Sequence, residues 1–227
     1  MISAATRLVA LLGHPVAHSL SPRMQNAAFA AVGLDWAYVA LDVQPERLEQ
    51  AVHGLAALGF AGANVTAPHK LAVARIVGAD EPSVNTLVVR DGALEASSTD
   101  AAILAGLPAE RPVIVGGGGA ATAFAAALPH ARRFERRGAW PPEVEGADLV
   151  VHATSVGDEV VVRLGPGQTL VDLPYPGSAT AAAARAAGAT VLDGLDVLVA
   201  QGAASFERWT GVAAPVEVMR AAVRSHA

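Results

Sequence analysis

A short apolar strand that runs straight into four glycines and then into an alanine-rich helix constrains the fold of this chain most. The strand covers residues 113–115, the glycines cover 116–119, and the helix continues to Leu128. Gly116 would make the tight turn, Gly118 would let the backbone approach a pyrophosphate, and Ala121 would permit close helix packing. A flexible linker is the alternative, but apolar strand and helix patterns flank the glycines directly. The sequence therefore predicts an α/β fold with a Rossmann-like dinucleotide site.

Charged residues after the next expected strand bear on which dinucleotide would bind. Glu135 and Arg136 follow Phe134 at the place where such a fold holds the adenosine ribose. An acidic side chain suits a free 2'-hydroxyl, whereas arginine suits a 2'-phosphate, and we favour the phosphate because arginines gather here. A solvated charged edge is the alternative. Only ten residues separate Arg137 from the strand expected at 148–151, so we expect a loop there instead of a helical crossover.

The first half of the chain alternates strand and helix patterns, which predicts a second α/β unit. Ser21 before Pro22 indicates a helix N-cap, and Ser19 lies two residues earlier. Two hydroxyls at a helix N-terminus favour an anion such as a substrate carboxylate, although capping alone would account for Ser21. Asp91 and Gly92 indicate a hairpin turn. Strands are expected at residues 8–12, 38–43, 60–65 and 84–89, and helices at 21–33 and 45–58, the latter with Leu58 on its apolar face.

Lys70 is the only lysine among 16 basic residues. Arginine stays protonated, whereas an ammonium can release and recover a proton. Pro68 is expected at the first helical position, which places Thr66 near the cap and Lys70 in the first turn, where the helix dipole disfavours a cation. We therefore expect Lys70 to carry proton-transfer chemistry, as a less basic amine or beside a carboxylate. The alternative for Lys70 is a chance surface lysine. Asp100 precedes another helical pattern, and its alternative role is that of an N-cap.

Composition limits the class of protein. The chain has 227 residues, of which 52% are hydrophobic, with no cysteine and a net charge of -5. These values predict one large or two small domains, exclude disulfides and thiolate sites, and argue against a nucleic-acid partner. Glycines 116–119 and Pro129 interrupt the longest uncharged run, so no membrane span is expected. The lack of a basic leader predicts a cytoplasmic location, and the scattered histidines predict no metal site.

Several spaced motifs make the chain resemble the shikimate dehydrogenase family over nearly its full length. They are GHPVAHSLSP at 13–22, NVTAPHK at 64–70, VNTL at 84–87, Thr99 with Asp100, the glycine turn at 116–121, ATSVG at 153–157 and DGLDVLVAQG at 193–202. The resemblance implies an N-terminal α/β substrate domain at residues 1–100 and 199–227, onto which the C-terminal helices pack. It also implies a compact Rossmann-like NADP-binding domain at residues 101–198.

The reaction that this resemblance implies is the reversible NADP-dependent reduction of 3-dehydroshikimate to shikimate, with NAD as the alternative cofactor. Lys70 and Asp100 would form the acid–base pair. The implied substrate-binding residues are Ser19, Ser21, Asn64, Thr66, Asn85, Tyr175 and Gln201. The implied cofactor-binding residues are Gly116, Gly118, Gly119, Ala120, Ala121, Glu135, Arg136, Thr154, Ser155 and Gly194.

Two other functions stay open at this point. One is a paralogue that uses NAD and acts on quinate or a related carboxylate, since both substrates carry the group that the serines would bind. The other is a non-catalytic, dinucleotide-binding regulatory protein. The presence of both Lys70 and Asp100 argues against this second function, because a binding protein needs no proton donor. We expect a small-molecule carboxylate as substrate and a monomer or homodimer.

Overall fold

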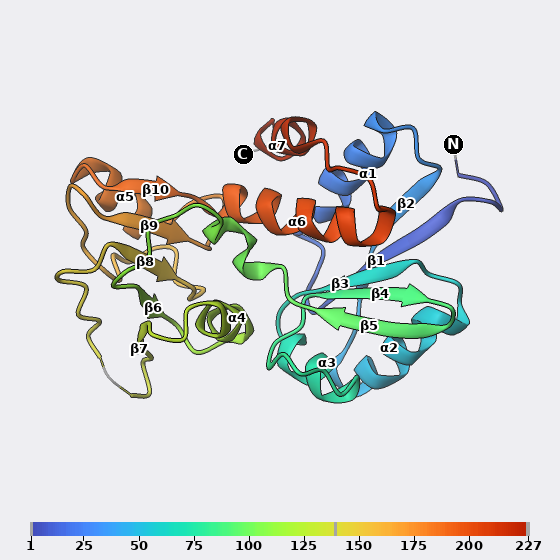
Figure 1. Cartoon of the computed structure of the whole chain (residues 1–227), viewed down its shortest axis with the longest axis horizontal. Coiled ribbons are helices and arrows are strands. Elements are labelled where there is room, and N and C mark those ends of the chain that lie inside the picture. The colour runs from blue at the N-terminus through green and yellow to red at the C-terminus, as the bar shows by residue number, and fades with distance from the viewer. Residues whose placement is uncertain (1, 139, 226–227) are drawn as a thin grey trace. The chain divides into compact units, whose positions relative to one another are not determined.

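Two compact units make up the structure, a computed structural model that describes residues 2–138 and 140–225 (Figure 1). The first unit contains the chain up to Thr99 and again from Val199 onward, and the second runs from Asp100 to Leu198. Each unit has a five-stranded sheet. This arrangement confirms the predicted α/β fold with two sheet-containing parts.

The first unit is built around a mixed sheet with the strand order β2-β1-β3-β4-β5. Strand β1 pairs in parallel with β2 and β3, whereas β4 pairs antiparallel with β3 and β5. The strands are β1 (Arg7–Gly13), β2 (Trp36–Asp42), β3 (Gly62–Val65), β4 (Thr86–Arg90) and β5 (Ala93–Ser97). The helices are α1 (Ser21–Ala31), η1 (Pro45–Arg47), α2 (Leu48–Ala57), α3 (Lys70–Ile76), α7 (Val216–Arg224) and the part of α6 (Gly194–Thr210) from Val199 onward.

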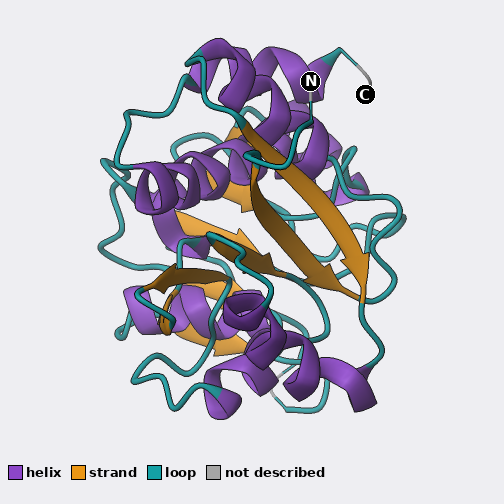
Figure 2. Ribbon diagram, turned by 90° about the vertical axis from the view of Figure 1, so that its right-hand side faces the viewer, coloured by secondary structure: helices purple, strands orange, loops and turns teal. Residues whose placement is uncertain are grey.

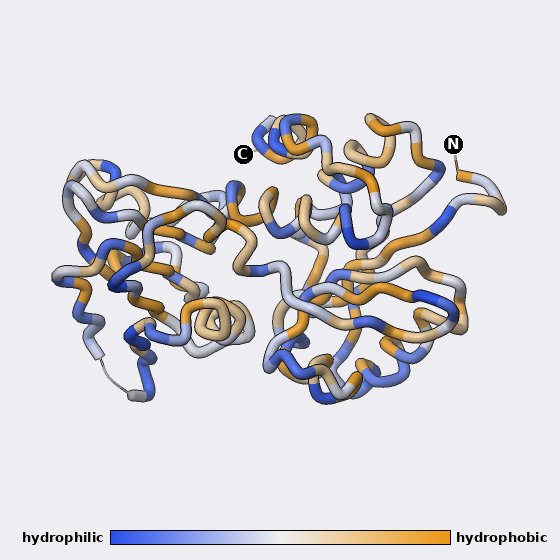
Figure 3. Tube along the Cα trace, viewed as in Figure 1, coloured by the Kyte–Doolittle hydropathy of each residue, from blue (hydrophilic) through white to orange (hydrophobic). Residues whose placement is uncertain are grey.

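Strand β1 is buried on both faces, which explains its unbroken apolar run. Ala10 and Leu12 belong to the core formed with α2 and α3. On the opposite face, Phe29 of α1 stacks on Phe206 of α6 with ring centroids 5.4 Å apart. Figures 1 and 2 show helices on both sides of this sheet, and Figure 3 shows hydrophobic colour along its inner strands. The C-terminal helices thus complete the core of the first unit.

The hairpin between β4 and β5 has the turn that its sequence predicts. Asp91 and Gly92 connect the two strands and have φ angles of 50° and 79°. Two consecutive positive φ angles give a turn whose twist matches that of the flanking strands. The expected hairpin is therefore confirmed.

The expectations for Pro68 and Leu58 in the first unit are wrong. Pro68 does not occupy a helical position, because the backbone forms a turn in which the His69 N–H donates to the Thr66 carbonyl oxygen at 2.9 Å. Helix α3 begins only at Lys70, so Lys70 does lie in the first turn. Leu58 is 74% exposed, because α2 ends one residue before it.

The second unit is a parallel sheet with the order β10-β9-β8-β6-β7. One face packs on α5 and the other on α4 and the 3-10 helix η2. In the described parts of the β7–β8 connection, residues 135–138 and 140–148, there is no helix, as predicted. The elements are η2 (Asp100–Leu104), β6 (Val113–Val115), α4 (Gly119–Ala127), β7 (Arg132–Phe134), β8 (Leu149–His152), β9 (Thr169–Asp172), α5 (Ala179–Ala186) and β10 (Thr190–Leu192). None of the described helices has the length and hydrophobicity that crossing a membrane requires.

Substituting alanine for two glycines of the first unit should change its stability in opposite directions. A Cβ added to Gly62 in β3 would meet the Leu87 carbonyl oxygen and the Trp209 indole ring. We therefore expect Gly62→Ala to lower the free energy of unfolding by about 1–3 kcal/mol. Gly54 inside α2 has its nearest neighbouring atom 3.9 Å away, so Gly54→Ala is the matched control. The control should raise the free energy of unfolding by about 0.5–1 kcal/mol. Urea denaturation measures both changes, and an unaffected Gly62→Ala protein would contradict this packing.

Candidate functional site

Loops that follow β1 and β3 meet at one edge of the first sheet, because these parallel neighbours both end there. Gly13 ends β1, and a Cβ at this position would collide with the Thr66 methyl group. Asn85 lies just before β4 at the same edge, where its carbonyl oxygen accepts the Val65 N–H at 2.8 Å. The structure thus gathers the loops at residues 14–20 and 66–69 with Asn85.

Ser19 and Ser21 differ from their predicted local roles. Helix α1 begins at Ser21 and its N-cap is Leu20, which has no side-chain cap. The Ser19 Oγ instead accepts the Ser21 N–H at 3.2 Å. The prediction that Ser21 is the N-cap is therefore wrong, because the hydroxyl two residues earlier reaches the free amide at the helix start. Ser21 is 6% exposed, whereas Ser19 is half-buried.

The buried phenol of Tyr38 connects Ser21, at the start of α1, to Asn64. The Tyr38 hydroxyl donates to the Asn64 Oδ1 at 2.9 Å, and both side chains are buried. Burial raises the pKa of Tyr38 well above its usual range and outweighs its hydrogen bond with Ser21, which lowers the pKa. The phenol therefore stays protonated and keeps its role as donor.

Asn64 uses its amide entirely inside the first unit. Its Nδ2 donates to the Asn85 carbonyl oxygen at 3.0 Å and to the Ser205 Oγ at 2.9 Å, and it lies 3.3 Å from the Thr86 Oγ1. Because its Oδ1 accepts from Tyr38, Asn64 ties α6 to β2 and β4. This arrangement suits a residue that supports the site from behind.

Asn85 and Gln201 hold the residue that precedes Asp100. The Asn85 Oδ1 accepts the Thr99 N–H at 2.7 Å, and the Asn85 Nδ2 donates to the Thr99 Oγ1 at 3.0 Å. The Asn85 Nδ2 also lies 3.3 Å from the Gln201 Oε1, and the Thr99 hydroxyl donates to the Gln201 carbonyl oxygen at 3.0 Å. Asp100 follows directly and is 6% exposed. The backbone leading into Asp100 is thus fixed by side chains of the first unit.

Lys70 is half-buried at the start of α3. The preceding His69 is 2% exposed, and its Nε2 lies 2.7 Å from the Val43 carbonyl oxygen. This contact fixes the backbone from which Lys70 projects. Lys70 belongs to the first unit, whereas Asp100 and Tyr175 belong to the second.

The glycine turn of the second unit has the conformation that its sequence predicts. Gly116 has a φ angle of 139°, and a Cβ there would lie 2.5 Å from the Ala153 carbonyl oxygen. Gly118 has nothing within 4 Å of an added Cβ, so the space beside it is open. Helix α4 starts at Gly119, directly after this open position. Ala121 is fully buried, as close helix packing requires.

The expected cofactor residues lie at the carboxyl ends of strands in this parallel sheet. Strands β6 and β8 are neighbours, although β7 lies between them in the sequence, so the direction of winding changes there. Open α/β sheets bind their ligands at such a point, outside the carboxyl ends of the strands. The turn at 116–119 follows β6, and Thr154 and Ser155 follow β8. Gly194 follows β10, where a Cβ would lie 2.6 Å from the Leu173 carbonyl oxygen.

Glu135 and Arg136 take different positions after β7. The Glu135 carboxylate lies against the glycine turn, since a Cβ on Gly117 would be 2.8 Å from its Oε2. Arg133 pairs with Glu135 at 3.1 Å. The Arg136 guanidinium lies 3.6 Å from Glu159 in a mostly exposed pair. The acid thus lies beside the turn, and the arginine is bound to the loop after β8.

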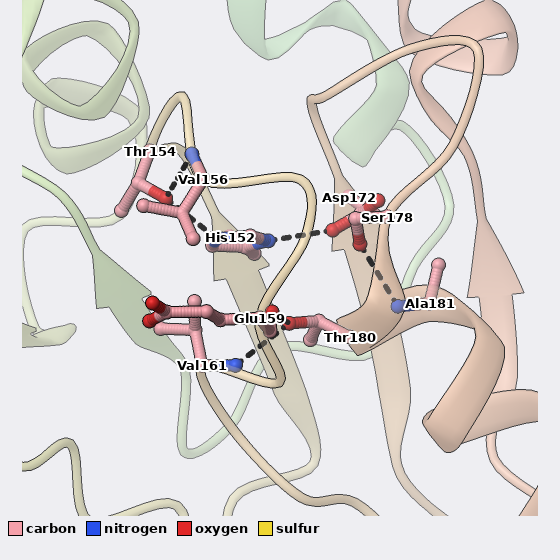
Figure 4. Close-up of polar contacts among 9 residues, drawn as sticks. All are labelled: His152, Thr154, Val156, Glu159, Val161, Asp172, Ser178, Thr180 and Ala181. Carbon is pink, nitrogen blue, oxygen red and sulfur yellow. Dashed lines mark hydrogen bonds and ion pairs between the residues drawn. The ribbon is translucent and has the colours of Figure 1, made fainter.

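Sequence reasoning missed a buried polar pair in the second unit. The His152 Nδ1 lies 2.6 Å from the Asp172 Oδ1, and both side chains are fully buried (Figure 4). The His152 Nε2 lies 2.6 Å from the Thr154 Oγ1. The available signal was Asp172 itself, a charged residue that interrupts the apolar run of Leu170, Val171 and Leu173. Among residues 2–138 and 140–225, no group of three or more potential ligands is arranged to hold a metal ion.

Comparisons with known proteins agree with these observations. The family model of the shikimate dehydrogenase substrate binding domain matches residues 11–87, and that of the shikimate 5'-dehydrogenase C-terminal domain matches residues 194–224. Shikimate dehydrogenase (NADP(+)) of Moorella thermoacetica is 43% identical over 98% of this chain and 94% of that protein. The enzyme of the same name from Methanopyrus kandleri is 40% identical over 99% of this chain and 97% of that protein. The structure of shikimate 5-dehydrogenase from Thermus thermophilus was solved with NADP(H) and shikimate. It matches this structure with a TM-score of 0.86 and 30% sequence identity, and the match covers 98% of this chain and 100% of that chain.

Proposed function

Since this chain belongs to the shikimate dehydrogenase family, we propose that it catalyses the reversible NADP-dependent reduction of 3-dehydroshikimate to shikimate. The observation that carries this conclusion is the 43% identity to an NADP-dependent shikimate dehydrogenase over 98% of the chain. The glycine turn supports it, because an open backbone at Gly118 directly before the N-terminus of α4 fits a pyrophosphate.

The substrate carboxylate is assigned to the hydroxyls of Ser19, Ser21 and Thr66. Ser19 and Thr66 lie on the loops that meet at the edge of the first sheet, and Ser21 begins α1 directly after the first of these loops, which supports a shared ligand. Neutral hydroxyl donors orient a carboxylate without moving a proton. Tyr175, after β9, is assigned to the same end of the substrate. Asn64 takes a supporting role, because its amide is used within the unit.

The ring hydroxyls are assigned to Asn85, Gln201 and Asp100. Asn85 and Gln201 lie within 3.3 Å of one another, and both bind Thr99, the neighbour of Asp100. A substrate that binds these groups would therefore be held by the same network that fixes the Asp100 backbone. Loss of the Asn85 or Gln201 hydrogen bond to the substrate should weaken binding more than turnover.

Lys70 and Asp100 are assigned as the acid–base pair. When bound, NADPH supplies a hydride to the ring ketone. The ketone oxygen gains negative charge and must take up a proton, which the Lys70 ammonium donates. The Asp100 carboxylate would hold this ammonium and orient it towards the ketone oxygen. In shikimate oxidation the neutral Lys70 amine accepts the hydroxyl proton.

The cofactor is assigned to the carboxyl edge of the second sheet. The backbone at Gly116, Gly118, Gly119, Ala120 and Ala121 would hold the pyrophosphate. Thr154, Ser155 and Gly194 follow neighbouring strands at this edge, and Glu135 with Arg136 would meet the adenosine ribose.

A two-by-two assay tests the proposed function: shikimate and quinate are each offered with NADP and with NAD. We expect the highest kcat/KM for shikimate with NADP. A protein that prefers quinate with NAD would be the other dehydrogenase. A protein that binds NADP and oxidises neither substrate would be a regulatory dinucleotide-binding protein.

The same assay tests the residues that select the cofactor. Arg136→Ala should reduce the preference for NADP over NAD about tenfold, because it removes a charged partner for the 2'-phosphate. Glu135→Gln should increase this preference, since a carboxylate beside the glycine turn repels the phosphate. Exposed Arg163 gives the control, Arg163→Ala, which should leave the ratio unchanged. An unaltered ratio in Arg136→Ala would show that this arginine is solvated surface only.

A further inference from the structure

The buried pair of His152 and Asp172 is built into the sheet by register. They are the last residues of β8 and β9 and face each other as register partners. Val150 and Leu170, two residues earlier on each strand, belong to the core that packs on α5. Because side chains two apart point to the same face, the pair also points towards α5.

Stability alone is a poor explanation for this pair. Removing a carboxylate and an imidazole from water costs several kcal/mol unless hydrogen bonds compensate, and apolar residues of similar volume often do better. The Asp172 Oδ2 is buried and has no hydrogen-bond partner within the described part of the chain. Such a cost indicates a role beyond packing.

His152 fixes the direction of one hydroxyl. The His152 Nδ1 faces the Asp172 Oδ1 and the Nε2 faces the Thr154 Oγ1, so the imidazole lies between the carboxyl group and the hydroxyl. An Nε2 without a hydrogen makes the Thr154 hydroxyl a donor to it, and an Nε2 that carries a hydrogen makes the Thr154 Oγ1 an acceptor. The same oxygen accepts the Val156 N–H at 3.2 Å. Whether Nε2 carries a hydrogen therefore decides if the Thr154 hydroxyl hydrogen points towards His152 or away from it.

Thr154 is held directly beside the glycine turn. The Ala153 N–H donates to the Val115 carbonyl oxygen at 2.8 Å, and the Ala153 carbonyl oxygen occupies the space where a Cβ on Gly116 would lie. Rotation of the Thr154 hydroxyl therefore takes place next to the backbone that would receive the pyrophosphate.

The loop that begins at Thr154 is anchored at its far end as well. The Gly157 carbonyl oxygen accepts the Ala179 N–H at 2.8 Å, and the Thr180 Oγ1 accepts the Val161 N–H at 2.9 Å (Figure 4). The loop is thus fixed by α5 at one end and by His152 at the other. Loss of the His152 contact would free only the Thr154 end.

We propose that His152 and Asp172 are positioning residues for NADP: they set the hydrogen-bonding direction of the Thr154 hydroxyl, and this hydroxyl binds the cofactor. The inference rests on the proposed function, in which Thr154 is a cofactor residue. Neither member of the pair touches the cofactor, so their effect must pass through Thr154.

A double-mutant cycle read by direct NADP+ binding, without substrate, tests this coupling. We expect Thr154→Val and His152→Gln each to raise the Kd about tenfold, the loss of one oriented hydrogen bond. The double variant should bind no more weakly than Thr154→Val alone, because the pair has nothing left to orient. Thr154→Ser keeps the hydroxyl and should therefore keep the wild-type Kd for NADP+. In steady-state assays, the KM for NADPH should rise while the KM for 3-dehydroshikimate and kcat change little.

Ser178→Ala is the matched control, because Ser178 caps α5 in the same unit through the Ala181 N–H. It should lower thermal stability and leave the Kd for NADP+ unchanged. If His152→Gln fails to fold, Asp172→Asn enters the same cycle, since it keeps the side-chain shape. The inference would be overturned if His152→Gln weakened binding equally in the wild-type protein and in the Thr154→Val variant, or if it had no effect in the wild-type protein.

Failure of the inference and failure of the proposed function give different results. A wild-type protein that binds NADP+ but oxidises no shikimate would disprove the reaction, and the binding cycle would still decide the role of His152. A wild-type protein that turns over shikimate with NADP, with an additive cycle, would disprove only the role of His152. A wild-type protein that does not bind NADP+ would disprove both.

Discussion

Lys70→Arg should lower kcat for shikimate oxidation by about 10²–10⁴-fold, the usual contribution of a positioned acid or base. Arginine keeps the positive charge, so the KM for shikimate should change little. Its guanidinium stays protonated at working pH, however, so it cannot accept the hydroxyl proton. Of the 16 basic residues in the chain, Lys70 is the only one with an amine that can do so.

Initial rates in both directions measure this effect, together with NADP+ binding as a check that the second unit is intact. Arg75→Lys is the control, because Arg75 is exposed on the same helix, α3. It adds a lysine without altering the site and should leave kcat unchanged. Near-normal turnover in Lys70→Arg would remove Lys70 from the acid–base role.

Asp100→Asn should reduce kcat about 10²-fold or more, because a neutral amide cannot form the ion pair that orients the ammonium for proton transfer. Asp100 is buried, and the preceding Thr99 is fixed by Asn85, so the exchanged side chain should keep its place. Residues that act as a unit lose activity non-additively. We therefore expect the double variant Lys70→Arg/Asp100→Asn to be no slower than the slower single variant.

Asp91→Asn is the matched control for this charge removal. Asp91 lies in the exposed turn between β4 and β5 at a φ angle of 50°, where asparagine is equally well accommodated. Its kcat should equal that of the wild type. Fully additive losses in the double variant would contradict the pairing of Lys70 and Asp100.

Local sequence patterns predicted those features whose causes are local. The glycine turn at 116–119 could be predicted because the φ angle of Gly116 and the open space at Gly118 follow from glycine within a strand–turn–helix pattern. The hairpin turn at Asp91 and Gly92 could be predicted for the same reason, because these two residue types accept the positive φ angles that the turn requires. The prediction for Ser21 was wrong because two hydroxyls stood close enough to cap the same helix, and sequence spacing alone does not decide between them.

Contacts between distant segments could not be predicted in this way. Asn64 and Ser205 are separated by 141 positions, and nothing near either residue indicates their hydrogen bond. The pair of His152 and Asp172 depends on the register of two parallel strands, which a single sequence does not give. Asp172 within an apolar strand was a visible anomaly, but its partner became evident only once β8 and β9 were seen side by side.

The division of the chain sets the order in which its parts can be completed during synthesis. The second unit is one continuous segment and can close its sheet once Leu198 has left the ribosome. The first unit begins earlier but needs Ser205 and Trp209, and the Trp209 indole reaches a Leu87 carbonyl oxygen made 122 residues before it. Until then, the face of the first sheet that α6 covers stays open to solvent. The unit that is translated first is therefore the last to become a folded, protease-resistant body.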